Sequence, residues 1–351
     1  MRISERVIRY VALAFVVLGA LGIVALTISL AGYDAAAAGR AAADGAFGST
    51  FAVLSATLKR ATPLLLLGIA VAVAFRAGVL NIGAEGQFLA GAAAATAVGL
   101  SAPFDSTIVL LVLEAGAAIA AGSAWAGLAA WLKIRFGVTE VVSTLLLNFV
   151  ALNLVGFLVR GPLQEPTGAY PQTLSLPESA RLPVLIEGQR LHWGFVIALV
   201  VAFGAWWMFR YTAAGFRARI SGFSRSAAES AGNIAVERVQ GSALLASGAI
   251  AGLAGFCEVT GVTYALFEGL SPGYGYAAIG VALLGGLHPI GIIGSAVLFG
   301  ALGSGADAMQ RNAGIPAEFA AVVASMIVLG VLAVPSLQRA VFRALKQRAL
   351  A

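Results

Sequence analysis

The chain has 351 residues, of which 60% are apolar before its 43 glycines are counted, and the mean hydropathy is +0.93. Soluble domains contain about 45–50% apolar residues with glycine included, so this composition excludes a soluble globular protein and predicts a polytopic membrane protein. The net charge is +6, but no basic cluster is interleaved with aromatic residues, which argues against nucleic acid as a partner.

The N-terminal segment combines three arginines, Arg2, Arg6 and Arg9, with an apolar run over 11–30. Residues 35–38 resemble a cleavage site. The apolar region of a secretory signal is about 7–15 residues long, and this run is longer. We therefore interpret it as a retained first span, with cleavage as the alternative.

Apolar runs predict an all-α membrane helix bundle, because about 20 residues of helix cross a bilayer. We expect about ten spans, with nine as the alternative, in one transmembrane domain over residues 1–351. The segment at 274–287 is short and rich in glycine, so we expect it to be broken or re-entrant. The predicted spans are 7–31, 52–75, 84–103, 106–132, 139–159, 193–209, 239–261, 274–287, 289–309 and 317–335.

The basic residues are divided unevenly between the two ends of these spans. With the N-terminus inside, most of the 22 lysines and arginines fall on the inner side. Cytoplasmic loops carry such an excess, so we expect both termini in the cytoplasm and a multi-pass protein of the cell (inner) membrane.

The segment 75–91 places polar side chains between two long apolar runs. Arg76, Asn81, Glu85 and Gln87 lie there among four glycines. A charged side chain at the bilayer centre costs roughly 2.5–3.5 kcal/mol on insertion scales, so such residues usually face a protein interior or a watery path. We predict an irregular segment that lines a pathway, although a structural pair such as Arg76 with Glu85 is the alternative.

A second polar stripe runs along the span at 139–159. Glu140, Thr144 and Asn148 are spaced four residues apart, so they share one helix face that is expected to point into the bundle. Asn148 is a candidate for the pathway, and hydrogen bonding between helices is the alternative. Further along, Gly248 and Gly252 have the spacing of a close helix–helix contact.

Two loops are long enough to have roles of their own. The outer loop, 160–192, contains five prolines and is expected to form an irregular extracytoplasmic cap that docks a partner or only links spans. In the inner loop, 210–238, Ser226 and Glu229 have capping-box spacing, which predicts a short helix. That helix either inserts into a cleft of another protein or belongs to an ordinary basic loop.

Several stretches together resemble one family of transport proteins. They are FRAGVLNIGAEGQFLAGA (75–92), EVVSTLLLNFVALNL (140–154), GYGYAAIGVALLGGLHPIG (273–291) and the inner loop. The chain resembles the permease subunits of ABC importers for branched-chain amino acids, ribose-type sugars and nucleosides, and in particular the nucleoside and simple-sugar branch.

The resemblance implies partners and a coupling site. It implies an ABC ATPase subunit, an extracytoplasmic solute-binding protein and a second permease subunit, identical or related. None of the three lysines follows a glycine, as a phosphate-binding GxxxxGK[ST] loop requires, so ATP and Mg would be bound by the ATPase and no cofactor by this chain. The residues that match the family's coupling loop are Gly215, Arg219, Gly222, Ala227, Ala228 and Gly232.

These observations predict a translocation subunit that is not itself an enzyme, and no catalytic residue is proposed. The single cysteine, Cys257, excludes a multi-cysteine metal site, and no metal site is expected. A self-sufficient secondary transporter or channel for a small polar solute is the alternative function. The candidate pathway residues are Asn81, Glu85, Gln87 and Asn148.

Overall fold

The structure is a computed structural model that describes residues 5–330 except 103, 105, 233, 317, 320, 324 and 327. The described residues form two compact units. One contains the residues up to Thr57 and those from Phe299 onward, and the other contains Leu58–Leu298. The predicted last span, 317–335, lies partly outside the described residues.

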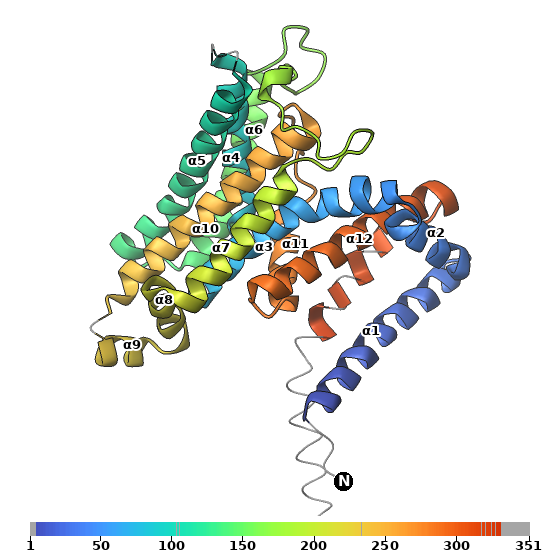
Figure 1. Cartoon of the computed structure of the whole chain (residues 1–351), viewed down its shortest axis with the longest axis horizontal. Helices are drawn as coiled ribbons and strands as arrows, with labels where there is room; N and C mark the ends of the chain where they lie inside the picture. Colours follow the sequence, from blue (N-terminus) through green and yellow to red (C-terminus); the bar gives the residue numbers. More distant parts are fainter. Residues whose placement is uncertain are drawn as a thin grey trace, which may run out of the picture. The chain divides into compact units, whose positions relative to one another are not determined.

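All regular structure in the described part of the chain is helical, which confirms the predicted all-α class (Figure 1). Short π-helices, Ala52–Leu58 and Val259–Thr263, extend α3 and α10, and Glu178–Ala180 is a 3₁₀ turn. The α-helices are α1 (Glu5–Leu30), α2 (Ala35–Phe47), α3 (Lys59–Arg76), α4 (Ala84–Ser101), α5 (Thr107–Phe136), α6 (Glu140–Arg160), α7 (Gly194–Tyr211), α8 (Ala213–Phe223), α9 (Arg225–Gly232), α10 (Val236–Glu258), α11 (Tyr274–Leu284) and α12 (Pro289–Ala313).

Six helical segments in the described residues are long and apolar enough to cross a membrane. This agrees with a multi-pass membrane protein, whereas the count of about ten spans and the side on which the termini lie stay predictions. The six are Ala52–Arg76, Thr107–Phe136, Glu140–Arg160, Gly194–Tyr211, Val236–Thr263 and Pro289–Ala313.

Helix α10 is the centre of the larger unit and packs against α3, α4 and α5. Glycines make these contacts close enough for backbone to meet backbone. A Cβ added to Gly248 or Gly252 would overlap the carbonyl oxygen of Gly122 or Ala118 on α5. The close packing predicted from the glycine spacing is therefore confirmed, because only a residue without a side chain fits at these crossings.

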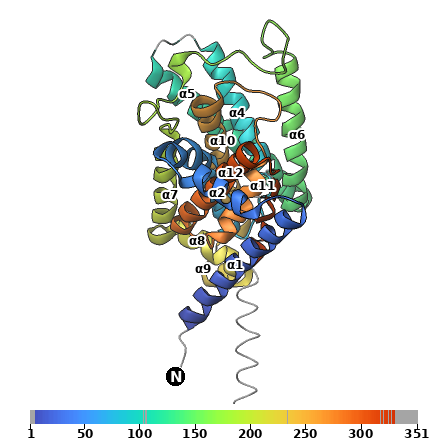
Figure 2. The same cartoon turned by 90° about the vertical axis from the view of Figure 1, so that its right-hand side faces the viewer.

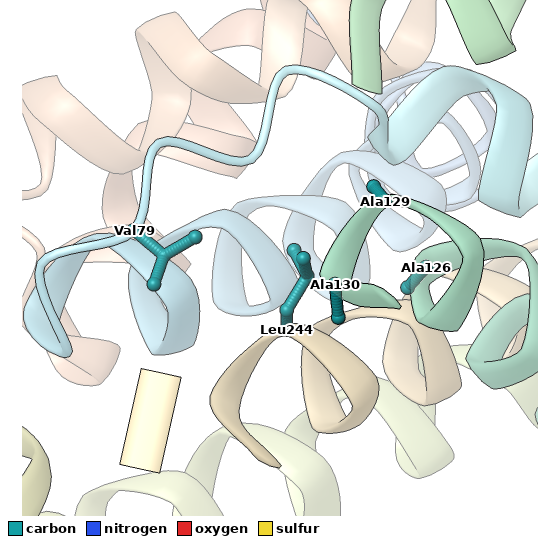
Figure 3. Packing of buried hydrophobic residues seen from close by; sticks show 5 residues of the cluster. All are labelled: Val79, Ala126, Ala129, Ala130 and Leu244. Carbon is teal, nitrogen blue, oxygen red and sulfur yellow. The ribbon is translucent and has the colours of Figure 1, made fainter. Parts of the chain in front are cut away.

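Buried apolar side chains continue the packing of α5 against α10, as Figure 3 shows. There the irregular segment between α3 and α4 rests on α5 and α10 through a cluster of buried apolar residues. Its members are Val79, Ala126, Ala129, Ala130 and Leu244.

Helix α6 lies along one edge of the larger unit (Figure 2) and buries only one stripe of residues. Thr144 and Asn148 belong to that stripe, as the four-residue spacing predicted. Glu140 lies at the helix start and forms an ion pair with Lys133 of α5, with 3.3 Å between Oε2 and Nζ.

The loop between α6 and α7 is irregular, as its prolines predicted, but it is well attached. Its backbone is hydrogen-bonded to the chain after α10: the amides of Thr173, Leu176 and Leu182 donate to the carbonyls of Leu266, Tyr264 and Thr260 at 2.7–2.9 Å. The ion pair of Arg160 with Glu268 adds a side-chain link between the same two segments.

In the smaller unit, residues 35–38 begin helix α2. Their resemblance to a cleavage site did not predict this helix. Asp34 caps α2 by accepting hydrogen bonds from the amides of Ala36 and Ala37 at 2.8 and 3.1 Å. An aspartate before a run of alanines is a helix start signal, so the helix was readable from the sequence. Gly45 of α2 lies directly against Ala308 of α12.

Candidate functional site

The chain between α3 and α4 is a bend, as predicted. Helix α3 ends at Arg76, and Gly78 has a left-handed backbone with φ of +79°. A side chain at Gly78 is therefore disfavoured. The next residues lie outside helices until α4 begins at Ala84, so an irregular segment interrupts the polar stretch identified in the sequence.

Asn81 is the centre of the first buried hydrogen-bond network at this bend. Its Nδ2 donates to Gln87 Oε1 at 2.9 Å and to Ser247 Oγ of α10 at 2.8 Å. Its Oδ1 accepts from the amide of Gly83 at 2.9 Å and from Gln87 Nε2 at 3.1 Å. Ser247 extends the network to α3 by donating to the carbonyl of Ala70 at 2.6 Å. The bend is thus fixed to α3, α4 and α10.

Asn148 attaches the same bend to α6. Its Oδ1 accepts from the amide of Gly86 at 2.8 Å, and its Nδ2 donates to the carbonyl of Ile82 at 2.9 Å. The Nδ2 group also donates to the hydroxyl of Tyr276 on α11 at 3.2 Å. The side-chain amide of Asn148 therefore joins the bend, α6 and α11.

Glu85 lies in the first turn of α4 and faces the start of α11. Its Oε2 accepts a hydrogen bond of 2.6 Å from the amide of Gly275. A carboxylate at a helix N-terminus is stabilised by the unpaired amides and the dipole of that helix. Gly275 is required for this approach, because a Cβ there would overlap the backbone of Glu85.

The four predicted pathway residues therefore meet in one region, and none is more than 5% exposed. Their polar groups are bonded within the chain, and for Asn148 this is the interhelical bonding that the sequence left open as the alternative. The suggested pair of Arg76 with Glu85 is wrong: Arg76 stacks on the ring of Phe209, at 4.7 Å, and Glu85 binds Gly275. The sequence analysis did not identify Ser247 as part of this region. The one feature that could have indicated it is a polar residue next to Gly248, at a close helix contact.

The inner loop contains two short helices, of which one was predicted. Thr212 caps the unexpected helix α8 by accepting from the amide of Gly215 at 3.1 Å. The predicted helix is α9, but its cap is Ser224, whose hydroxyl accepts from the amide of Ala227 at 3.3 Å, and not Ser226. Glu229, the other half of the expected capping box, instead binds Arg225 at 2.9 Å.

The six predicted coupling residues divide into those that face the chain and those that face outward. A Cβ on Gly215 would overlap Met208, and one on Gly222 would overlap the carbonyl of Arg76, so these glycines seat α8 against α7 and the bend. Ala228 is fully buried, whereas Arg219 and Ala227 are exposed. Gly232 ends α9.

Charged side chains of α9 and α5 have partners at the start of α10. Arg225 binds Glu237 at the start of α10 at 3.2 Å, and Lys133 donates to Gln240 at 2.9 Å. They border a cavity of about 290 Å³ whose apolar floor includes Val79, Ala130 and Leu244. The first pair ties α9 to the start of α10, and the second ties α5 to the start of α10.

The comparison with known proteins decides the family. The family described as "branched-chain amino acid transport system, permease component" matches residues 53–332. The chain belongs to this permease family. The match includes the bend, the buried network and both helices of the inner loop.

Three relatives resemble the permease along most of their length. A guanosine ABC transporter permease protein of Bacillus subtilis is 37% identical, over 87% of this chain and 88% of its own. A glucose ABC transporter permease protein of Haloferax volcanii is 35% identical, over 79% and 75%. A nucleoside ABC transporter permease protein of Lactococcus lactis is 31% identical, over 78% and 77%. No solved structure matches the chain.

Proposed function

We propose that this permease is the membrane-spanning subunit of an ABC importer that carries nucleosides or related sugar-bearing solutes into the cell. The observation that carries the proposal is the similarity, over most of the chain, to permeases named for guanosine and for nucleosides. The glucose permease among the relatives keeps sugar-bearing solutes within the proposed class.

The proposed working unit contains more than this chain. An ABC ATPase subunit binds ATP and Mg and docks at the inner loop, and an extracytoplasmic solute-binding protein delivers the solute. A second permease subunit, identical or related, completes the unit in the cell membrane. In this arrangement both termini and α8–α9 lie on the cytoplasmic side.

The contact between α8 and the bend supplies a mechanical route for coupling. Gly222 meets the backbone of Arg76 and Gly78 so closely that no side chain fits between them. A displacement of α8 by the ATPase therefore acts on the bend directly rather than through a flexible side chain. Gln240 of α10 also donates to the carbonyl of Gly78, at 3.4 Å, so the central helix is attached at the same point.

The bend in turn carries the buried network. Asn81 follows Gly78 by three residues and binds Gln87 and Ser247. We propose that moving the bend exchanges these internal hydrogen bonds for bonds to the solute, with Asn81, Glu85, Gln87 and Asn148 exposed to the pathway in that state. Amide and carboxylate groups are suitable partners for the hydroxyl and base edges of a nucleoside.

Uptake of labelled guanosine by proteoliposomes tests the proposal. The permease is reconstituted with its ATPase, its second permease subunit and its binding protein, and unlabelled nucleosides, glucose, ribose and leucine compete. We expect uptake that requires ATP and is abolished by excess nucleoside but not by leucine.

Other outcomes would contradict different parts of the proposal. Uptake without ATP or ATPase would favour a self-sufficient transporter. ATP-driven uptake that glucose or ribose abolishes and nucleosides do not would leave the importer in place and replace the solute.

A further inference from the structure

A second cavity in the larger unit is lined mainly by basic and aromatic side chains. Its volume is about 210 Å³, and it lies where α3 and α7 end, beside α8 and the start of α12. The residues that line it are Arg76, Trp206, Phe209, Arg210, Arg219, His288 and Pro289.

The three guanidinium groups of this cavity have no acidic counterpart among the described residues that line it. Among the described residues, Arg76, Arg210 and Arg219 form no ion pair with a carboxylate. Arg76 stacks on Phe209, at 4.7 Å from the ring centre, and the charge of Arg219 is close enough to oppose that of Arg76. Like charges held together without a carboxylate indicate a site for an anion from outside the chain.

The location of the cavity favours a membrane lipid as the source of that anion. Trp206 and Phe209 lie in the last turns of α7, a membrane-spanning candidate, and Trp206 packs edge-on against Tyr211 at 5.6 Å. Tryptophan, tyrosine and arginine gather where a span meets the headgroup layer. Apolar ring surface beside the arginines suits a headgroup that continues into acyl chains better than a free ion.

We propose that this cavity binds the phosphate of an anionic phospholipid. Arginine forms paired, charge-assisted hydrogen bonds with phosphate oxygens, and basic pockets between membrane helices hold anionic headgroups. His288 supplies a further donor at the rim, and Pro289 begins α12, whose N-terminal end is positive.

Lipid binding at this place has a mechanical consequence. The phosphate would bridge Arg76 at the end of α3, Arg210 at the end of α7 and Arg219 on α8. Both Arg76 and Arg219 would be attracted to the phosphate. This attraction would offset the repulsion between the two arginines and hold α8 against the bend. Under the proposed topology the lipid comes from the cytoplasmic leaflet, and its occupancy sets how firmly the inner loop is held.

Native mass spectrometry of the delipidated full chain in detergent tests the proposal directly. Phosphatidylglycerol is titrated as the anionic probe, with phosphatidylcholine as the neutral one, on wild type, Arg210→Gln, Arg219→Gln and Arg217→Gln. Arg217 is the matched control, because it is also exposed on α8 but does not line the cavity. Melting temperatures in detergent verify that each variant is folded.

We expect phosphatidylglycerol to bind in preference to phosphatidylcholine. Losing Arg210 or Arg219 should weaken that binding roughly fivefold each, the effect of one basic residue near an anionic lipid surface, and losing Arg217 should change it little. Equal binding of both lipids, or an equal effect of all three substitutions, would overturn the proposal.

Two competition measurements separate the lipid from other anions. If millimolar inorganic phosphate displaces phosphatidylglycerol, the cavity is a site for the free ion and the lipid assignment fails. If the purified ATPase subunit displaces the lipid, the arginines are covered by an acidic surface of that protein instead. Lipid binding that survives both competitors supports the proposal.

Discussion

The bend between α3 and α4 and the arginine-lined cavity adjoin at Arg76, yet their polar groups are treated in opposite ways. At the bend, Asn81, Gln87 and Asn148 are at most 2% exposed and bonded within the chain. In the cavity, Arg210 and Arg219 are exposed, and the described residues that line it include no carboxylate.

The difference reflects the free-energy cost of burying a polar group that has no hydrogen-bond partner. An unsatisfied donor or acceptor in the interior costs about 1–3 kcal/mol, so a stable fold pairs such groups. An exposed guanidinium is hydrated and costs the fold little, so it is available for an outside partner. We therefore expect changes at the bend to act mainly on stability and changes at the inner loop to act mainly on binding and coupling.

The largest expected effect lies at the glycine crossing beneath the bend. Gly252→Leu should prevent folding of the larger unit, at more than about 3 kcal/mol, because the added side chain meets the backbone of Ala118 rather than movable side chains. The yield of monodisperse protein in size-exclusion chromatography measures this. The matched control is Gly204→Leu on α7, where no atom lies within 4 Å of an added Cβ. Similar yields from both variants would show that the crossing tolerates a side chain.

Asn81→Leu should cost about 2–4 kcal/mol of unfolding free energy, because it leaves buried groups of Gln87 and Gly83 without partners. Thermal denaturation in detergent measures the loss. Asn153→Leu is the control, because Asn153 is exposed on α6 and bonds only to its own helix, at Phe149. Adding Gln87→Leu should recover part of the loss. If Asn81→Leu instead left stability unchanged and impaired only uptake, Asn81 would be a solute contact and not a structural one.

His192 is buried, and only one of its two ring nitrogens has a hydrogen-bond partner among the described residues. Its Nδ1 accepts from the amide of Gly194 at 3.1 Å, and its Nε2 has no partner among the described residues. Burial, with a smaller effect of the nearby Lys59 charge, lowers the pKa of His192 from 6.5 to about 4. The unfolded chain therefore binds the proton more tightly.

Stability should consequently fall as the pH is lowered from 6.5 through about 4. At pH 5 we expect a loss of about 2 kcal/mol relative to neutral pH. Melting temperatures of wild type and His192→Gln between pH 7.5 and 5 measure it, and the variant should lose most of the dependence. His288→Gln, at an exposed position, should keep it. An unchanged pH dependence in His192→Gln would contradict this prediction.

The smallest effect on stability, and the clearest effect on coupling, is expected for Gly222→Ala. The methyl group meets the backbone of Arg76 and Gly78, and α8, a surface helix, can move outward to accept it. Contact with the bend is weakened, so uptake per ATP hydrolysed should fall about tenfold, equivalent to about 1.4 kcal/mol. Gly204→Ala is the control. Unchanged uptake per ATP in the reconstituted complex would exclude this contact as the coupling route.

Replacing Ala228 is a less selective probe of coupling than its match to the family's coupling loop implies. The residue is fully buried within the chain, so a bulky charged side chain there disturbs α9 itself. Ala227 is exposed on the same helix and is the better position for testing contact with an ATPase.

The sequence by itself determined the class of the protein, the long apolar helices, the bend and the existence of a short helix in the inner loop. These are local properties: hydropathy over about 20 residues defines a span, and glycine with polar residues inside an apolar run marks a break. The family resemblance was equally local, since it rested on four continuous stretches, and the comparison with known proteins confirmed it.

Only the tertiary structure decided what each polar residue does. Asn81 and Ser247 are 166 positions apart, and Glu85 and Gly275 are 190 apart, so no periodicity in the sequence joins them. The same holds for Arg76, Arg210 and Arg219, which the positive-inside pattern counted as separate charges and which the fold gathers around one cavity. Helix packing brings together residues from spans far apart in the chain, and it alone decides which polar groups are paired and which remain available to a partner.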